Sequence, residues 1–121
     1  MGMAHIQQDY IPEITVPSRI VRGDAEDFYQ DAKALSVDSD YLNVCFSQVT
    51  TFDAVSMGAL IHLRKNVIPP STTIFVSGLS EALYEMLKFL RLDMLFVLIA
   101  PADVVQRNKQ KSEQDARLWD F

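Results

Sequence analysis

The stretch that decides the fold reads Phe52-Asp53-Ala54-Val55-Ser56-Met57-Gly58-Ala59-Leu60-Ile61-His62-Leu63-Arg64-Lys65. It follows a mostly apolar run, residues 42–46, and a hydroxyl-rich run, residues 47–51. Asp53 suits a helix N-cap because its carboxylate can accept hydrogen bonds from the free amides two or three residues later. We therefore predict a buried central strand at 42–46, covered on both faces, then a loop and a helix over 54–66. The free amides and the helix dipole make this corner suitable for an anionic group or a partner contact.

Strands and helices alternate along the rest of the chain. Five apolar residues at helical spacing predict one buried face for the first helix, and a similar stripe marks the third. Alternating elements with short connections favour a mainly parallel sheet packed by helices. We therefore predict a single α/β domain with a mainly parallel sheet of about four to five strands and about four helices. The other predicted strands are residues 14–16, 19–21, 72–76 and 94–99, and the other helices begin at the N-caps Asp24 and Ser80 and at Pro101. The stripe of the first helix comprises Ala25, Phe28, Tyr29, Ala32 and Leu35. The stripe of the third helix comprises Leu83, Met86, Leu87 and Leu90.

Length and charge limit the function classes. A chain of 121 residues fits one domain, which we place at 11–107, between a lead-in of residues 1–10 and a polar extension of residues 108–121. The net charge of −5 argues against binding nucleic acid or an anionic membrane. The longest apolar run, residues 94–100, is far shorter than the roughly 20 residues of a membrane-spanning helix. No secretion signal is visible and Cys45 is the single cysteine, so we expect a cytoplasmic protein.

The C-terminal part is polar from Gln106 to Gln114, which predicts a segment that cannot pack on the core. It is followed by Leu118-Trp119-Asp120-Phe121, which contains the single tryptophan. Two interpretations stay open. The segment is either a mobile tail or a small docking element, because tryptophan is enriched where proteins bind one another.

No residue pattern predicts catalysis or a metal site. One cysteine and two histidines lack recognisable zinc-ligand spacing. Cys45 lies mid-strand without a charged neighbour, which favours an inert core thiol, and His62 is interpreted as a helix residue at the solvent edge. Ser56 has no histidine nearby and no Gly-x-Ser-x-Gly turn around it. The scattered glycines match neither phosphate-loop pattern. We therefore expect a protein without catalysis, metal or cofactor, although an enzyme with an unrecognised pocket stays a third alternative.

Several short motifs follow one another along the chain. They are Val49-Thr50-Thr51-Phe52-Asp53, Met57-Gly58-Ala59-Leu60, Leu63-Arg64-Lys65, Thr73-Ile74-Phe75-Val76-Ser77-Gly78-Leu79-Ser80 and Leu87-Lys88-Phe89-Leu90-Arg91-Leu92-Asp93-Met94-Leu95-Phe96. In this order they resemble the STAS domain family, which includes anti-sigma-factor antagonists and the regulatory tails of sulfate transporters. The resemblance covers about residues 14–106. It implies a bacterial signalling protein that binds a kinase-type anti-sigma factor and thereby releases a sigma factor. An alternative is a non-catalytic STAS subunit of a larger assembly, such as a lipid-transport ATPase or a stress-signalling scaffold, and a homodimer also stays open.

One position departs from the family. Its antagonists carry a phosphorylatable serine directly after the motif aspartate, where this chain has Ala54. A phosphate there would add nearly two negative charges beside the partner surface, so its loss favours a constitutive binder. Thr50, Thr51 and Ser56 are the remaining hydroxyls, and we choose Ser56 as the substitute phosphoacceptor because we expect it in an exposed first turn.

The helix of residues 54–66 carries the candidate partner-binding site. One stripe can face the sheet, which turns Met57 and Ile61 toward the flank of the helix. They either contact a neighbouring helix or, with Ala54 and Val55, form a docking patch. The stripe comprises Ser56, Ala59, Leu60, Leu63 and Val67, and the partner-binding residues are Asp53, Ala54, Val55, Ser56, Met57, Ile61 and Arg64.

Overall fold

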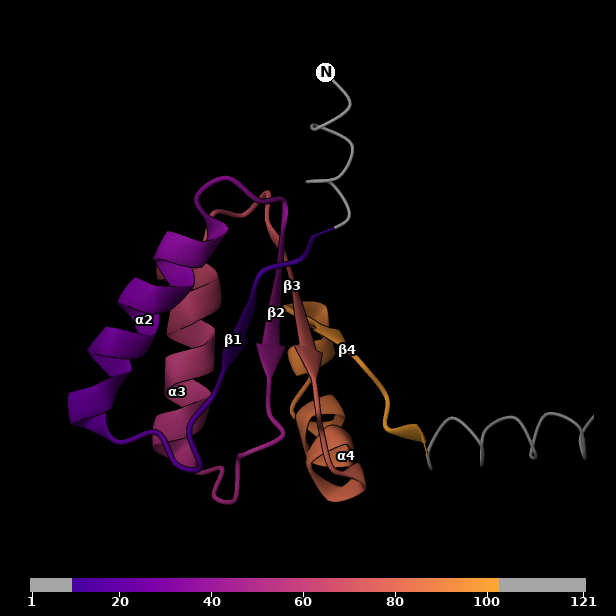
Figure 1. The fold of residues 1–121 in the computed structure, drawn as a ribbon. Coiled ribbons are helices and arrows are strands. Elements are labelled where there is room, and N and C mark those ends of the chain that lie inside the picture. The colour runs from indigo at the N-terminus through magenta and orange to yellow at the C-terminus, as the bar shows by residue number, and fades with distance from the viewer. Residues whose placement is uncertain (1–9, 103–121) are drawn as a thin grey trace, which may run out of the picture.

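The computed structural model describes residues 10–102, in which four parallel strands form one sheet in the order β1-β2-β3-β4 (Figure 1). This architecture confirms the predicted α/β class with a parallel sheet. The strands are β1 (Glu13–Thr15), β2 (Tyr41–Cys45), β3 (Thr73–Ser77) and β4 (Val97–Leu98). The α-helices are α2 (Arg22–Ser36), α3 (Ala54–His62) and α4 (Glu81–Phe89), and the short helical turns are η1 (Leu63–Val67) and η2 (Leu92–Met94).

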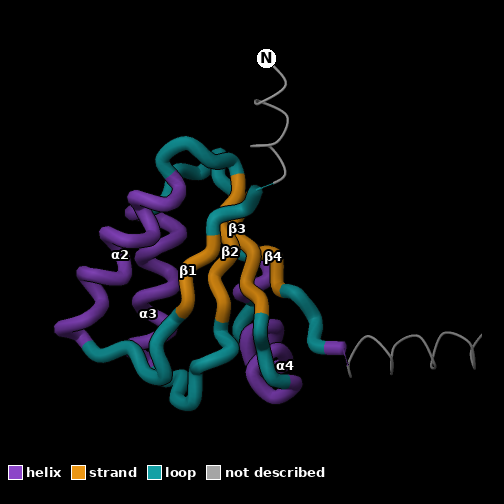
Figure 2. The backbone as a smooth tube through the Cα atoms, in the orientation of Figure 1, coloured by secondary structure: helices purple, strands orange, loops and turns teal. Residues whose placement is uncertain are grey.

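The helices cover one face of the sheet. Parallel crossovers are almost always right-handed, so strands that follow one another in sheet order place their helices on the same side. Burial along the strands agrees, because Leu42 and Val44 of β2 and their neighbours Ile74 and Val76 of β3 are buried, while the residues between them are not. Figure 2 shows α2 and α3 together at one side of the strands and α4 beside β3 and β4. The prediction that strand 42–46 is covered on both faces is therefore wrong.

The core lies between this face and the helices. Each helix contributes the residues of an i, i+4 seam to a single cluster of buried side chains. The seam residues are Phe28 and Ala32 from α2, Ala59, Leu60 and Leu63 from α3 and η1, and Leu83 and Leu87 from α4.

The first predicted helix begins earlier than its sequence suggested. The carbonyl of Val21 accepts from the amides of Asp24 and Ala25, so the helix starts at Arg22 and Asp24 lies in its first turn instead of capping it. The predicted strand at 19–21 is absent, because the chain there is the loop that leads into α2. Leu35 is 38% exposed, and Ser36 is buried in its place with its hydroxyl donating to the Lys33 carbonyl.

The two segments at the end of the fold are also shorter than predicted. Met86 of α4 and the C-cap residue Leu90 are exposed, so the buried seam of this helix is narrower than the predicted apolar stripe. β4 is limited to Val97–Leu98 because residues before it form the turn η2, entered through Arg91 in a left-handed conformation. The predicted helix after Pro101, the extension 108–121 and the segment Leu118–Phe121 lie outside the described residues, apart from Ala102 at the start of that helix.

The helix predicted over 54–66 is confirmed in position but changes type. α3 ends at His62 and continues as a π-helical turn, in which the Ile68 amide donates to the Leu63 carbonyl at 3.0 Å. π-turns of this kind frequently occur near functional sites. The wider turn lets Ile68 enter the core before the chain reaches Pro69.

Candidate functional site

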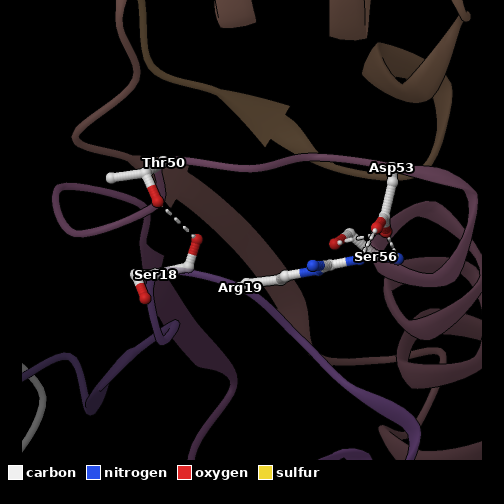
Figure 3. Close-up of polar contacts among 5 residues, drawn as sticks. All are labelled: Ser18, Arg19, Thr50, Asp53 and Ser56. Atoms are coloured by element: carbon white, nitrogen blue, oxygen red, sulfur yellow. Dashed lines mark hydrogen bonds and ion pairs between the residues drawn. The ribbon is translucent and has the colours of Figure 1, made fainter.

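The N-terminus of α3 forms a surface corner fixed by its cap. Asp53 Oδ1 accepts a hydrogen bond from the Ser56 amide at 3.0 Å and another from Ser56 Oγ at 3.2 Å (Figure 3). This confirms the predicted N-cap. The amide bond is the main reason why the pKa of Asp53 lies below its ordinary value, with the Ser56 hydroxyl and the Arg19 charge adding to it. Asp53 is therefore a carboxylate at neutral pH, and in this form it caps the first turn of α3.

A second loop, between β1 and α2, joins this corner. Arg19 Nη2 lies 3.5 Å from Asp53 Oδ2, although the two residues are 34 positions apart in the chain. The Ser18 carbonyl accepts from the amides of Thr50 and Thr51, at 2.9 and 3.1 Å, and from Thr50 Oγ1 at 3.2 Å. Figure 3 shows the bond between Thr50 and Ser18 and the approach of Arg19 to Asp53, which join the two loops. The sequence interpretation missed Ser18 and Arg19. They join the corner because β1 pairs with β2, which brings the loops at the carboxyl ends of these two strands together.

Ala54 and Val55 line a hollow of about 340 Å³ between α3 and α2. Ala54 is exposed and Val55 half-buried, so both predicted patch residues reach the surface. The far wall is formed by Ala25 and Tyr29 of α2. The Tyr29 ring lies 4.7 Å from the His62 ring, and burial followed by the charge of Glu26 raises the pKa of the Tyr29 hydroxyl. The lining is therefore mainly apolar and carries no formal charge at neutral pH.

Met57 and Ile61 occupy the other flank of α3. Successive helix residues are 100° apart, which turns Met57 and Ile61 away from α2 while Ala54 lies between the two flanks. Both are half-buried, and Ile61 packs against the core. The predicted patch is thus not buried inside the domain, but it extends over two flanks of the helix with Ala54 at the crest.

Ser56 and Arg64 differ from their predicted roles. Ser56 is only 2% exposed and its hydroxyl is bonded to Asp53, so the prediction of an exposed first-turn hydroxyl is wrong. Thr50 and Thr51 are both exposed at this corner. Arg64 turns its guanidinium onto its own chain, donating to the carbonyls of Thr72 at 2.7 Å and Pro69 at 2.5 Å. Burial lowers the pKa of Arg64. The guanidinium therefore ties the loop before β3 to η1 instead of extending to a partner.

The groups weighed for other chemistry are dispersed. Within residues 10–102 no three His, Cys, Asp or Glu side chains come together where they could hold a metal ion. The Cys45 thiol is half-buried and donates to Ser47 Oγ at 3.2 Å, so it is not the core thiol that we expected. His62 is exposed, as predicted. None of the helices in this part of the chain combines the length and apolar character needed to cross a bilayer.

Fold and site together define a small parallel α/β domain with one elaborated corner. A capped helix start there lies between two tied loops and an apolar hollow. Comparison of the chain with protein-family models, with curated proteins and with solved structures finds no match.

Proposed function

We propose that this protein is a cytoplasmic, non-catalytic regulatory module that binds a protein partner at the corner of Asp53 and α3, in the manner of an anti-sigma-factor antagonist. The observation that carries the proposal is Ala54. Its side chain is exposed at the first residue of α3, at the mouth of the apolar hollow. The resemblance to STAS domains suggests a kinase-type anti-sigma factor as the partner.

The geometry supports a corner that is always ready to bind. One oxygen of the Asp53 carboxylate accepts the cap bond from Ser56 and the other pairs with Arg19. The exposed side of the helix at Ala54 is therefore neutral. Ala54 offers no hydroxyl for a phosphate, and Ser56 is enclosed behind Asp53. A phosphate would have to reach this corner at another residue, and Thr50 and Thr51 are the exposed hydroxyl residues between positions 50 and 56. The domain therefore acts as a constitutive binder unless Thr50 or Thr51 is modified.

Affinity purification from the native host tests this function. The full chain is compared with Ala54→Glu and Met57→Glu, which place a carboxylate on the crest and on one flank. A glutamate in the first turn suits the helix dipole, so the Ala54→Glu variant should stay folded. Ala82→Glu is the matched control, because Ala82 is also an exposed alanine in the first turn of a helix, α4.

The expected result is recovery of a histidine-kinase-type ATPase by the full chain and by Ala82→Glu, and its loss from both other variants. Retention of that partner by Ala54→Glu would place the interface elsewhere. Recovery of a transporter ATPase instead would support the alternative of a subunit in a larger assembly.

One observation favours that alternative. Large apolar side chains stand exposed on α4 and the turn after it, including Phe89 at 85% and Met94 at 73%. Large apolar side chains exposed on neighbouring elements are expected where a second protein packs. A subunit of a larger assembly would use this surface as well as the corner, so Phe89→Glu should disrupt the assembly. An antagonist with one interface should tolerate the same change.

A further inference from the structure

Within residues 10–102 no helix covers the sheet face opposite α2, α3 and α4, and this face carries its own hollow. In Figure 1 no helix crosses in front of β1, β2 or β3. The parallel register aligns Glu13, Asn43, Phe75 and Val97 in one row across the four strands. Their side chains alternate with the buried ones and therefore share the open face. A hollow of about 590 Å³ lies over this row, within the range of about 300–1,000 Å³ typical of small-molecule sites.

The lining combines aromatic and aliphatic side chains with a few polar groups. The Phe75 ring forms part of it and is stacked against the Tyr41 ring at 5.9 Å. Tyr10 and Ile11 border the hollow on the side of β1, and Ile99 borders it on the side of β4. Aromatic faces carry negative charge density, so they attract cations as well as apolar groups.

The polar groups in the hollow are mainly acceptors. Among the residues that the structure describes, Glu13 is the single charged one in the lining, and its carboxylate accepts from Asn43 Nδ2 at 2.8 Å. Asn43 Oδ1 is buried and has no hydrogen-bond donor within the described residues. Buried acceptors in native proteins almost always have a hydrogen-bond partner, so we expect a donor to bind this oxygen. Since no lysine or arginine among the described residues lines the hollow, a carboxylate or phosphate ligand would find no counter-charge in this part of the chain.

We propose that this face binds an organic ammonium ion with an apolar body. The ammonium pairs with the Glu13 carboxylate and, after a small rotation of the Asn43 amide, donates a hydrogen bond to Oδ1. The apolar body lies against Phe75 and Ile99. The positive charge of the ammonium is attracted by the Glu13 carboxylate and by the face of the Phe75 ring. The site lies on the face opposite α3, so this inference does not depend on the proposed docking corner.

Three matched probes test the proposal on the isotope-labelled full chain by backbone amide chemical shifts. They are 2-phenylethylamine, 2-phenylethanol and 3-phenylpropanoate, which share a phenyl ring and differ in the charge of the polar end. The amine should shift the amides of Asn43, Phe75 and Ser77, with a Kd about fivefold lower than that of the alcohol. The carboxylate should bind more weakly than either.

Glu13→Gln should raise the Kd of the amine about threefold, because an exposed carboxylate contributes modestly, and should leave the Kd of the alcohol unchanged. Glu85→Gln is the matched control. It removes an exposed carboxylate from α4 and should change neither Kd. A well-dispersed amide spectrum of each variant would confirm that it is folded.

Three outcomes would overturn the proposal. Equal binding of all three probes would show an apolar groove without charge selectivity. An unchanged amine affinity in Glu13→Gln would remove the carboxylate from the site. Shifts of the same amides with protein concentration alone would assign the face to a second copy of this chain.

Discussion

Gly78, in the turn between β3 and α4, should be the glycine whose substitution costs the most stability. Its φ is +68°, and a Cβ built there lies 2.8 Å from the Ser47 amide nitrogen and 3.2 Å from Ser47 Cα. The obstacle is backbone, so it cannot swing aside. This contact packs the loop after β3 against the loop after β2, which leads into the corner at Asp53. Gly78 therefore affects both the fold and the placement of the candidate site.

The magnitude follows from two contributions. A left-handed conformation costs an alanine about 1–2 kcal/mol, and the forced displacement of packed atoms adds about 1–3 kcal/mol. We expect Gly78→Ala to lower the free energy of unfolding by about 3 kcal/mol, which corresponds to a drop in Tm of about 10 °C for a domain of this size. The measurement is urea unfolding followed by circular dichroism, with Tm from a thermal scan.

Gly58→Ala is the control. Gly58 lies inside α3, and a Cβ there meets nothing within 4 Å. Alanine in a helix interior should raise the free energy of unfolding by about 0.5–1 kcal/mol. A loss of under about 1 kcal/mol in Gly78→Ala, or equal effects of the two changes, would refute the argument that this turn is locked against Ser47.

Three further predictions concern the corner and its support. Because hydrogen bonds from Ser56 lower the pKa of Asp53, the stability that its carboxylate contributes is present above the ordinary value of 3.8 and is lost as pH falls through the folded-state pKa. The stability advantage of the parent chain over Asp53→Asn should therefore shrink in acid, and an advantage independent of pH in urea titrations would contradict this. Ser56→Asp should cost about 3 kcal/mol or more in unfolding free energy, because it encloses a second carboxylate beside Asp53, and a parent-like Tm would show that Ser56 is accessible after all. Arg64→Met should lose about 2 kcal/mol and speed hydrogen exchange at Thr72, since two charge-assisted bonds to carbonyls disappear, whereas the exposed Lys65→Met should change neither.

The partial success of the sequence interpretation has a physical basis at α3. Its start was predictable because an N-cap is a local contact, here between Asp53 and an amide three residues later. Its buried stripe was predictable because helical periodicity fixes which residues share a face. Ser56 was misplaced for a related reason. A polar residue in a first turn is usually exposed, but this one points to the sheet and is satisfied by the cap.

The sequence by itself determined the alternation of strands and helices, the cap at Asp53 and the absence of a hydroxyl at Ala54, because each depends on residues within a few positions of one another. Only the tertiary structure decided that Arg19 meets Asp53, across 34 positions of chain, and that the helices of residues 10–102 all lie on one face of the sheet. The order of the strands decides both. It places the carboxyl ends of β1 and β2 side by side and sends every crossover helix to the same face, and no local pattern encodes that order.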